Sequence, residues 1–163
     1  MATPKSDPSG INSPELPEAQ YMTLGVIVAE WNSAITEALY DGAVKVWQAR
    51  GAAPNQIRRI NVPGTMELTY AARLLCLQEE YDAVVVLGCV IQGETKHFDY
   101  VCQSVTQGIT QLNLLYDTPV IFGVLTDNNI EQSRARAGGA KGNKGKEAAA
   151  TALKMAELRQ SMG

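Results

Sequence analysis

The chain has 163 residues, a mass of 17.6 kDa and a formal net charge of −3 at neutral pH. This length fits one domain with one core, and a hydrophobic share of 45% against 19% charged residues excludes wholesale disorder. The acidic balance argues against binding to nucleic acid or to an anionic membrane surface. Because its apolar runs are only of strand length and no signal-peptide pattern opens the chain, we expect a cytoplasmic protein without a membrane span.

Residues 1–20 differ in composition from the rest of the chain. Four prolines are separated by Ser, Asp and Glu, with few apolar side chains between them. This composition predicts a flexible, proline-rich tail that can extend along a partner subunit. Residues 21–163 are then the single folded domain.

Strands and helices are predicted to alternate from residue 24 onward. Short apolar runs indicate strands at 24–29, 57–62, 83–90 and 119–125. Apolar residues at helical spacing indicate helices from Ser33 to just before Gly51 and at 66–78, 98–115, 130–135 and 146–160, with a Gly/Lys-rich loop at 138–145. Such alternation implies right-handed crossovers. The predicted fold class is therefore α/β: a three-layer αβα sandwich around a four-stranded parallel sheet, flavodoxin-like.

Ligands of such a sheet bind beyond the carboxyl ends of its strands. Four segments that core packing does not explain come just after predicted strands, namely Trp31-Asn32, 63–67, Gln92–His97 and Thr126–Asn129. Because the carboxyl ends of parallel strands meet at one edge of the layer, these segments predict an active site there. We expect the site to be centred on residues 93–97.

His97 is the only histidine in the chain. A lone histidine is often structural, but this one follows Gly93, Glu94 and Thr95 at the predicted start of a helix. Exposed amides and the positive end of the helix favour a phosphate there, with the Thr95 hydroxyl as an added donor. An imidazole beside an anion site suits general acid–base catalysis, so we predict that His97 is catalytic.

Three further residues are candidates with an ordinary alternative each. Trp31 comes at a strand end before a polar residue, which suits stacking on a planar ligand, although it could also belong to the core. Arg136 lies beside a basic, glycine-rich loop that is more usually just solvated, but an arginine there can still clamp a phosphate with two parallel hydrogen bonds. Glu67 is as consistent with stabilising a helix dipole as with accepting a hydrogen bond from a ligand.

Several familiar kinds of site are missing from the sequence. It has no dinucleotide-binding fingerprint after the first strand, no serine nucleophile elbow and no Walker A spacing. Cys76, Cys89 and Cys102 lie in apolar surroundings without metal-ligand spacing, which is typical of small buried side chains in a reducing compartment. We therefore expect chemistry without a cofactor or a metal.

Taken together, the motifs resemble those of the 6,7-dimethyl-8-ribityllumazine synthase family, which carries out the penultimate step of riboflavin biosynthesis. The matching segments lie between residues 24 and 160 and are WN at 31–32, VPGTMEL at 62–68, GCVIQGETKHFDYV at 88–101, FGVLT at 122–126, IEQ at 130–132, RAG at 136–138 and GNKG at 142–145. The resemblance implies a transferase that condenses 5-amino-6-(D-ribitylamino)uracil with 3,4-dihydroxy-2-butanone 4-phosphate.

The same resemblance implies roles for individual residues. His97 would transfer protons with Glu147 as its orienter, while the amides of Glu94 and Thr95 would hold the substrate phosphate together with Arg136. A larger set would bind the pyrimidine and its ribityl chain: Trp31, Asn32, Thr65, Met66, Glu67, Val90, Ile91, Phe122 and Lys144. Gln92 stands where many members carry arginine, and Trp31 replaces a more usual phenylalanine.

The resemblance also implies partners. Family members are pentamers or sixty-subunit shells with each site shared between neighbours, so the implied partners are the small-molecule substrates, further copies of the chain and riboflavin synthase. One alternative is a catalytically weak flavin-binding or shell-forming protein, which the wide Trp31 indole would suit. Another is the related archaeal-type riboflavin synthase, against which the intact GETKH and GNKG segments argue.

Overall fold

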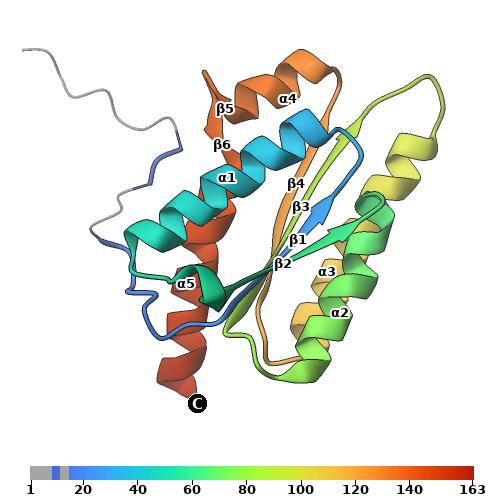
Figure 1. The fold of residues 1–163 in the computed structure, drawn as a ribbon. Helices are drawn as coiled ribbons and strands as arrows, with labels where there is room; N and C mark the ends of the chain where they lie inside the picture. The colour runs from blue at the N-terminus through green and yellow to red at the C-terminus, as the bar shows by residue number, and fades with distance from the viewer. Residues whose placement is uncertain (1–8, 12–14) are drawn as a thin grey trace, which may run out of the picture.

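The computed structural model describes residues 9–11 and 15–163. Figure 1 shows one central sheet with helices on both of its faces. The sheet has four parallel strands in the order β2-β1-β3-β4, with β1 at Leu24–Ala29, β2 at Ile57–Val62, β3 at Ala83–Ile91 and β4 at Val120–Asp127. The helices are α1 (Ser33–Ala49), α2 (Leu68–Gln78), α3 (His97–Leu115), α4 (Ile130–Arg136) and α5 (Lys144–Met162). The predicted three-layer α/β fold with a parallel sheet is confirmed.

The two faces of the sheet carry separate cores because alternate strand residues point to opposite sides. On β3, Val85 and Leu87 pack in the core formed with α1 and α5, whereas Val84 and Val86 pack in the core formed with α2 and α3. All four side chains are fully buried, as expected for a central parallel strand that is covered on both faces. In the part of the chain that the structure describes, no helix combines the length and the apolar character that crossing a membrane requires.

Element boundaries differ from the prediction at several ends. The helix expected from residue 66 begins with a single 3-10 turn at Thr65–Glu67, and α2 follows it. β4 continues to Asp127, and α5 begins at Lys144, two residues before its predicted start. The predicted 138–145 loop contains a small antiparallel hairpin, β5 (Ala137–Gly139) and β6 (Gly142–Asn143). Gly138 and Gly142 have positive φ angles, which glycine adopts without strain.

The segment before β1 is packed over part of its length. Leu16 and Ala19 are buried in the α1/α5 core, and the Ala19 amide donates to the Arg50 carbonyl oxygen at 2.7 Å. The folded part of the chain therefore begins before residue 21, since these two apolar side chains dock despite the proline-rich composition around them. Residues 1–8 and 12–14 of the predicted tail lie outside the described residues.

Candidate active site

A pocket of about 630 Å³ lies beyond the carboxyl ends of β1 and β3, beside the starts of α2 and α3. β1 and β3 are neighbours in the sheet, so the loops after them meet at this edge, where open α/β sheets bind ligands. Most of the predicted site residues line it: Trp31, Asn32, Thr65, Met66, Glu67, Val90, Ile91, Thr95 and His97. The sequence predicts that four strand-end segments converge at one edge of the sheet. The segments after β1, β2 and β3 line this pocket, whereas Thr126–Asn129 does not.

Asn32 fixes the position of Trp31 at the mouth of the pocket. The Asn32 backbone is left-handed with φ of 59°, a conformation that asparagine tolerates better than most residues. Its side-chain Nδ2 donates to the Cys89 carbonyl oxygen at 2.9 Å, and the Trp31 amide donates to the Pro63 carbonyl oxygen at 3.2 Å. The Trp31 side chain is 74% exposed, which rules out a core position in this chain and leaves the indole free to stack on a ligand.

The 3-10 turn at Thr65–Glu67 forms the floor near α2. The Glu67 carboxylate accepts a hydrogen bond of 2.9 Å from the Gly64 amide, so the helix-start role considered for Glu67 is observed, and the same side chain lines the pocket. Thr65 is buried against β3 at Gly88, where an added Cβ would lie only 2.7 Å from the Thr65 hydroxyl oxygen. Glycine at position 88 therefore lets the turn approach the strand closely.

The loop that precedes α3 closes the pocket on the other side. Gly93, Thr95 and His97 line it, while Glu94 is an exposed residue of the same loop. The His97 amide donates to the Thr95 hydroxyl oxygen at 3.4 Å. Since α3 has 19 residues, its first amides present a full helix dipole to an anion at this end. The His97 side chain is exposed, which gives it access to a ligand in the pocket.

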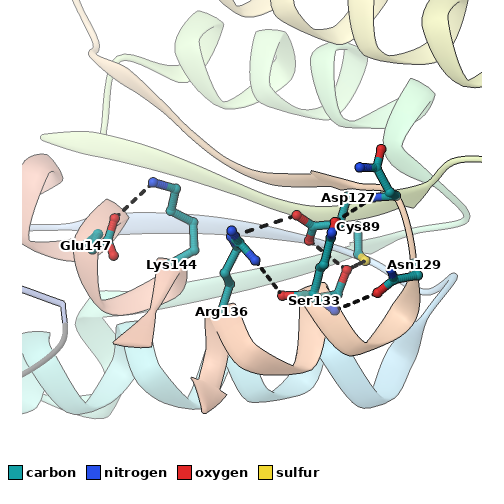
Figure 2. Close-up of polar contacts among 9 residues, drawn as sticks. Cys89, Asp127, Asn129, Ser133, Arg136, Lys144 and Glu147 are labelled. Atoms are coloured by element: carbon teal, nitrogen blue, oxygen red, sulfur yellow. Dashed lines mark hydrogen bonds and ion pairs between the residues drawn. The ribbon is translucent and has the colours of Figure 1, made fainter. Parts of the chain in front are cut away.

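A second group of predicted site residues does not line this pocket; three of them, Arg136, Lys144 and Glu147, are shown in Figure 2. Arg136 ends α4, and its Nη1 donates to the Gln132 carbonyl oxygen at 3.1 Å. On the first turn of α5, Lys144 Nζ lies 2.9 Å from Glu147 Oε2. Phe122 lies on β4, half-buried against the α2/α3 core. Within one chain, none of these residues lines the pocket that His97 lines, and Glu147 is paired with Lys144.

A buried polar cluster beside Arg136 was missed by the sequence reasoning. The Ser133 hydroxyl donates to Asp127 Oδ2 at 2.7 Å, and the Cys89 thiol lies 3.3 Å from the Ser133 oxygen. Asp127 was included in the strand-end segment 126–129 but was not singled out, and the spacing of Ser133 carries no signal of its own. Burial raises the pKa of the Cys89 thiol, so it stays protonated near neutral pH. Cys76 and Cys89 are buried as predicted, and Cys102 is partly buried.

The GNKG segment has a structural role as well as a place near the second group. The Asn143 side-chain oxygen accepts hydrogen bonds from the Gly145 and Lys146 amides and so caps α5, while Nδ2 donates to the Ala38 carbonyl oxygen on α1. An added Cβ at Gly145 would lie 1.9 Å from the Leu39 carbonyl oxygen. The start of α5 is thereby held against α1, which fixes where Lys144 and Glu147 project.

Comparison with known proteins agrees with this geometry. The family model for 6,7-dimethyl-8-ribityllumazine synthase matches residues 21–160. The chain is 52% identical over 155 residues to the 6,7-dimethyl-8-ribityllumazine synthase of Parabacteroides distasonis, covering 95% of this chain and 97% of that protein. It is 53% identical over 161 residues to that of Christiangramia forsetii, covering 98% and 96%. For the protein named likewise in Cytophaga hutchinsonii, identity is 55% over 143 residues, covering 88% and 90%. The chain therefore belongs to the 6,7-dimethyl-8-ribityllumazine synthase family.

Proposed function

We propose that the chain condenses 5-amino-6-(D-ribitylamino)uracil with 3,4-dihydroxy-2-butanone 4-phosphate to 6,7-dimethyl-8-ribityllumazine, at a site completed by two neighbouring subunits. The family relationship supports a transferase of riboflavin biosynthesis. The shared site is supported by one observation above all: Phe122, Arg136, Lys144 and Glu147 stand outside the pocket that holds His97 in a single chain.

The pocket of one subunit binds the pyrimidine and its ribityl chain. The exposed Trp31 indole stacks on the planar ring, and Val90 and Ile91 supply apolar walls. Polar groups of Asn32, Thr65 and Glu67 face the ribityl hydroxyls and ring substituents, with Met66 beside them. Phe122 and Lys144 reach this ligand from the neighbouring subunit.

The phosphate of the butanone binds at the start of α3. Glu94 and Thr95 come just before α3, which begins at His97 and whose dipole favours an anion at this end. Arg136 of the neighbouring subunit supplies charge-assisted hydrogen bonds to the same phosphate. Its side chain remains accessible for that purpose, because 41% of it is exposed.

His97 moves the protons of the condensation. The substrate amine attacks the ketone to give a Schiff base with loss of water, phosphate is then eliminated, and ring closure releases a second water. Each of these steps transfers protons without a change in redox state, so the reaction balances without a redox cofactor. Glu147 of the neighbouring subunit orients the His97 imidazole by accepting a hydrogen bond from it.

A shared site requires at least two chains, and the resemblance to the lumazine synthase family implies that the chains form a closed ring. We propose at least a pentamer of about 88 kDa, five times the 17.6 kDa of one chain, and favour the sixty-subunit shell that the family resemblance also implies, since only residues 137–143 separate α4 from α5. Riboflavin synthase, the enzyme of the next step, is a candidate partner, and the cytoplasm is the proposed location.

Complementation between two inactive variants tests both the reaction and the shared site. Mixing wild-type protein with the two substrates should give lumazine fluorescence, and its absence would remove the reaction. His97→Ala and Arg136→Ala are then co-expressed and assayed at a low butanone phosphate concentration, where each alone is nearly silent. In a mixed assembly, the Arg136→Ala chain supplies an intact pocket and the His97→Ala chain supplies an intact Arg136. Random mixing places these two parts together at about one subunit interface in four, so about a quarter of wild-type activity should return. The control is each variant co-expressed with itself. Co-assembled particles with no recovered activity would show that each chain builds its own site.

A further inference from the structure

The protein itself holds the Arg136 guanidinium at two points. Nη1 donates to the Gln132 carbonyl oxygen at 3.1 Å, and Nε lies 3.9 Å from Asp127 Oδ1 (Figure 2). A guanidinium carries five N–H donors, so these contacts still leave donors for a phosphate. Arg136 is therefore oriented before any ligand arrives.

Asp127 is fixed more firmly than a surface carboxylate. It is the last residue of β4 and is only 9% exposed. Its Oδ2 accepts a 2.7 Å hydrogen bond from Ser133, whose side chain is fully buried on the inner face of α4. A buried carboxylate is retained only where partners compensate its lost hydration. Here the compensating charge is Arg136 itself.

We infer that Asp127 is a positioning residue for the phosphate-binding arginine, held in turn by Ser133. The inference rests on the role proposed above for Arg136. A long arginine side chain loses rotamer entropy when it is fixed, and a preformed contact removes part of that loss from the binding step. The Asp127 charge opposes an incoming phosphate, so the net effect of removing it distinguishes positioning from simple repulsion.

Asp127→Asn tests the inference because it keeps the shape of the side chain and removes its charge. We expect the KM for the butanone phosphate to rise about 3–10-fold, with kcat and the KM for the pyrimidine unchanged. Competition by inorganic phosphate should weaken by the same factor. The matched control is Glu131→Gln, which breaks the 3.7 Å pair of Glu131 with Arg134 on the same helix, where both side chains are largely exposed. It should leave all three values unchanged. An unchanged or lowered KM in Asp127→Asn would overturn the inference.

The Arg136→Ala background separates positioning from a structural effect. There Asp127→Asn should add nothing to the KM for the butanone phosphate, and an additional rise would mean that Asp127 acts on the fold instead. If light scattering shows that Asp127→Asn does not assemble, Ser133→Ala replaces it. We expect Ser133→Ala to raise the KM for the butanone phosphate by a smaller factor, and an unchanged KM would overturn the inference. If Arg136→Ala leaves that KM unchanged, the proposed role of Arg136 fails. If Arg136→Ala raises it but Asp127→Asn leaves it unchanged, only the inference about Asp127 fails.

Discussion

The pocket region, residues 31–101 around His97, and the edge region, residues 122–147 around Arg136, hold their functional side chains in different ways. In the pocket region the anchoring partners are backbone groups: Asn32 donates to a carbonyl oxygen and Glu67 accepts from an amide. In the edge region the charged side chains are anchored partly to one another, Arg136 with Asp127 and Lys144 with Glu147. The first arrangement shapes a cavity. The second places charged side chains that do not line that cavity.

That difference indicates what each region lacks. The pocket region has a shaped, largely apolar cavity and a helix start, but Arg136 and Lys144 do not line it. The edge region has cations, yet pairs as exposed as Lys144 and Glu147 stabilise a fold by only a few tenths of a kcal/mol. In the proposed shared site these charges act on a ligand bound in the pocket of the neighbouring subunit. Under the shared-site proposal, each region supplies what the other is missing.

The largest expected effect comes from removing the His97 imidazole from the pocket region. His97→Ala should lower kcat by roughly 10²–10³-fold with a much smaller change in KM, because proton transfer is lost while the cavity remains. The estimate is moderate because holding the reactants together already promotes parts of the reaction. Stopped-flow formation of lumazine measures both constants.

Added imidazole serves as the control for that variant. It should restore part of the turnover of His97→Ala and leave the turnover of the wild type unchanged. If the variant were inactive because of a folding defect, imidazole would not restore its turnover. Wild-type turnover in His97→Ala without imidazole would contradict the catalytic assignment.

Removing the Arg136 side chain from the edge region should act on one substrate only. Arg136→Ala should raise the KM for the butanone phosphate by about 10–100-fold, which corresponds to the roughly 1.5–3 kcal/mol of a hydrogen bond to a charged group. Pyrimidine affinity, measured by isothermal titration, should stay nearly constant. A parallel loss of pyrimidine affinity would mean that the subunit contact had been disrupted, and light scattering would then show a smaller assembly.

The sequence predicted the fold, and also which residues come together in the pocket region, because these signals are local. Alternating apolar runs such as 83–90 specify buried parallel strands, and polar residues directly after them specify the rim. Trp31 was ambiguous in sequence, because an aromatic residue suits a core as well as a binding site. Only its 74% exposure in the structure separated the two.

The edge region was less predictable because its contacts depend on tertiary placement. Asp127 and Ser133 meet only because β4 turns directly into α4, and nothing in their spacing indicates a buried hydrogen bond. Leu16 and Ala19 were likewise obscured by prolines around them, although they pack in the core. Asn143 was noticed within a motif, but its contact with α1 follows from a helix crossing that the sequence does not display.

Removing the side chain that caps α5 tests how much the contact between α5 and α1 stabilises the edge region. Asn143→Ala removes the α5 cap and the bond to Ala38, so it should lower the free energy of unfolding by about 1–2 kcal/mol. Urea denaturation at one fixed protein concentration measures this. Asn129→Ala, which uncaps the short α4 where Asn129 accepts from the Gln132 amide, is the comparison and should cost less because that bond is exposed. Equal losses would show that the contact with α1 contributes nothing.

The smallest expected effect concerns stacking at the mouth of the pocket. Riboflavin, whose ring system is wider than a pyrimidine, should quench tryptophan fluorescence in the wild type and much less in Trp31→Ala, because the exposed indole and the flavin stack face to face. The structure removes the ambiguity of the second tryptophan: Trp47 is fully buried, and its Nε1 donates to the Ala149 carbonyl oxygen at 3.1 Å. Trp47→Phe is thus the matched control and should keep the quenching. For the pyrimidine substrate, Trp31→Ala should weaken binding only about 2–10-fold, the range of one aromatic pair. Equal quenching in the wild type and Trp31→Ala would place the flavin away from this pocket.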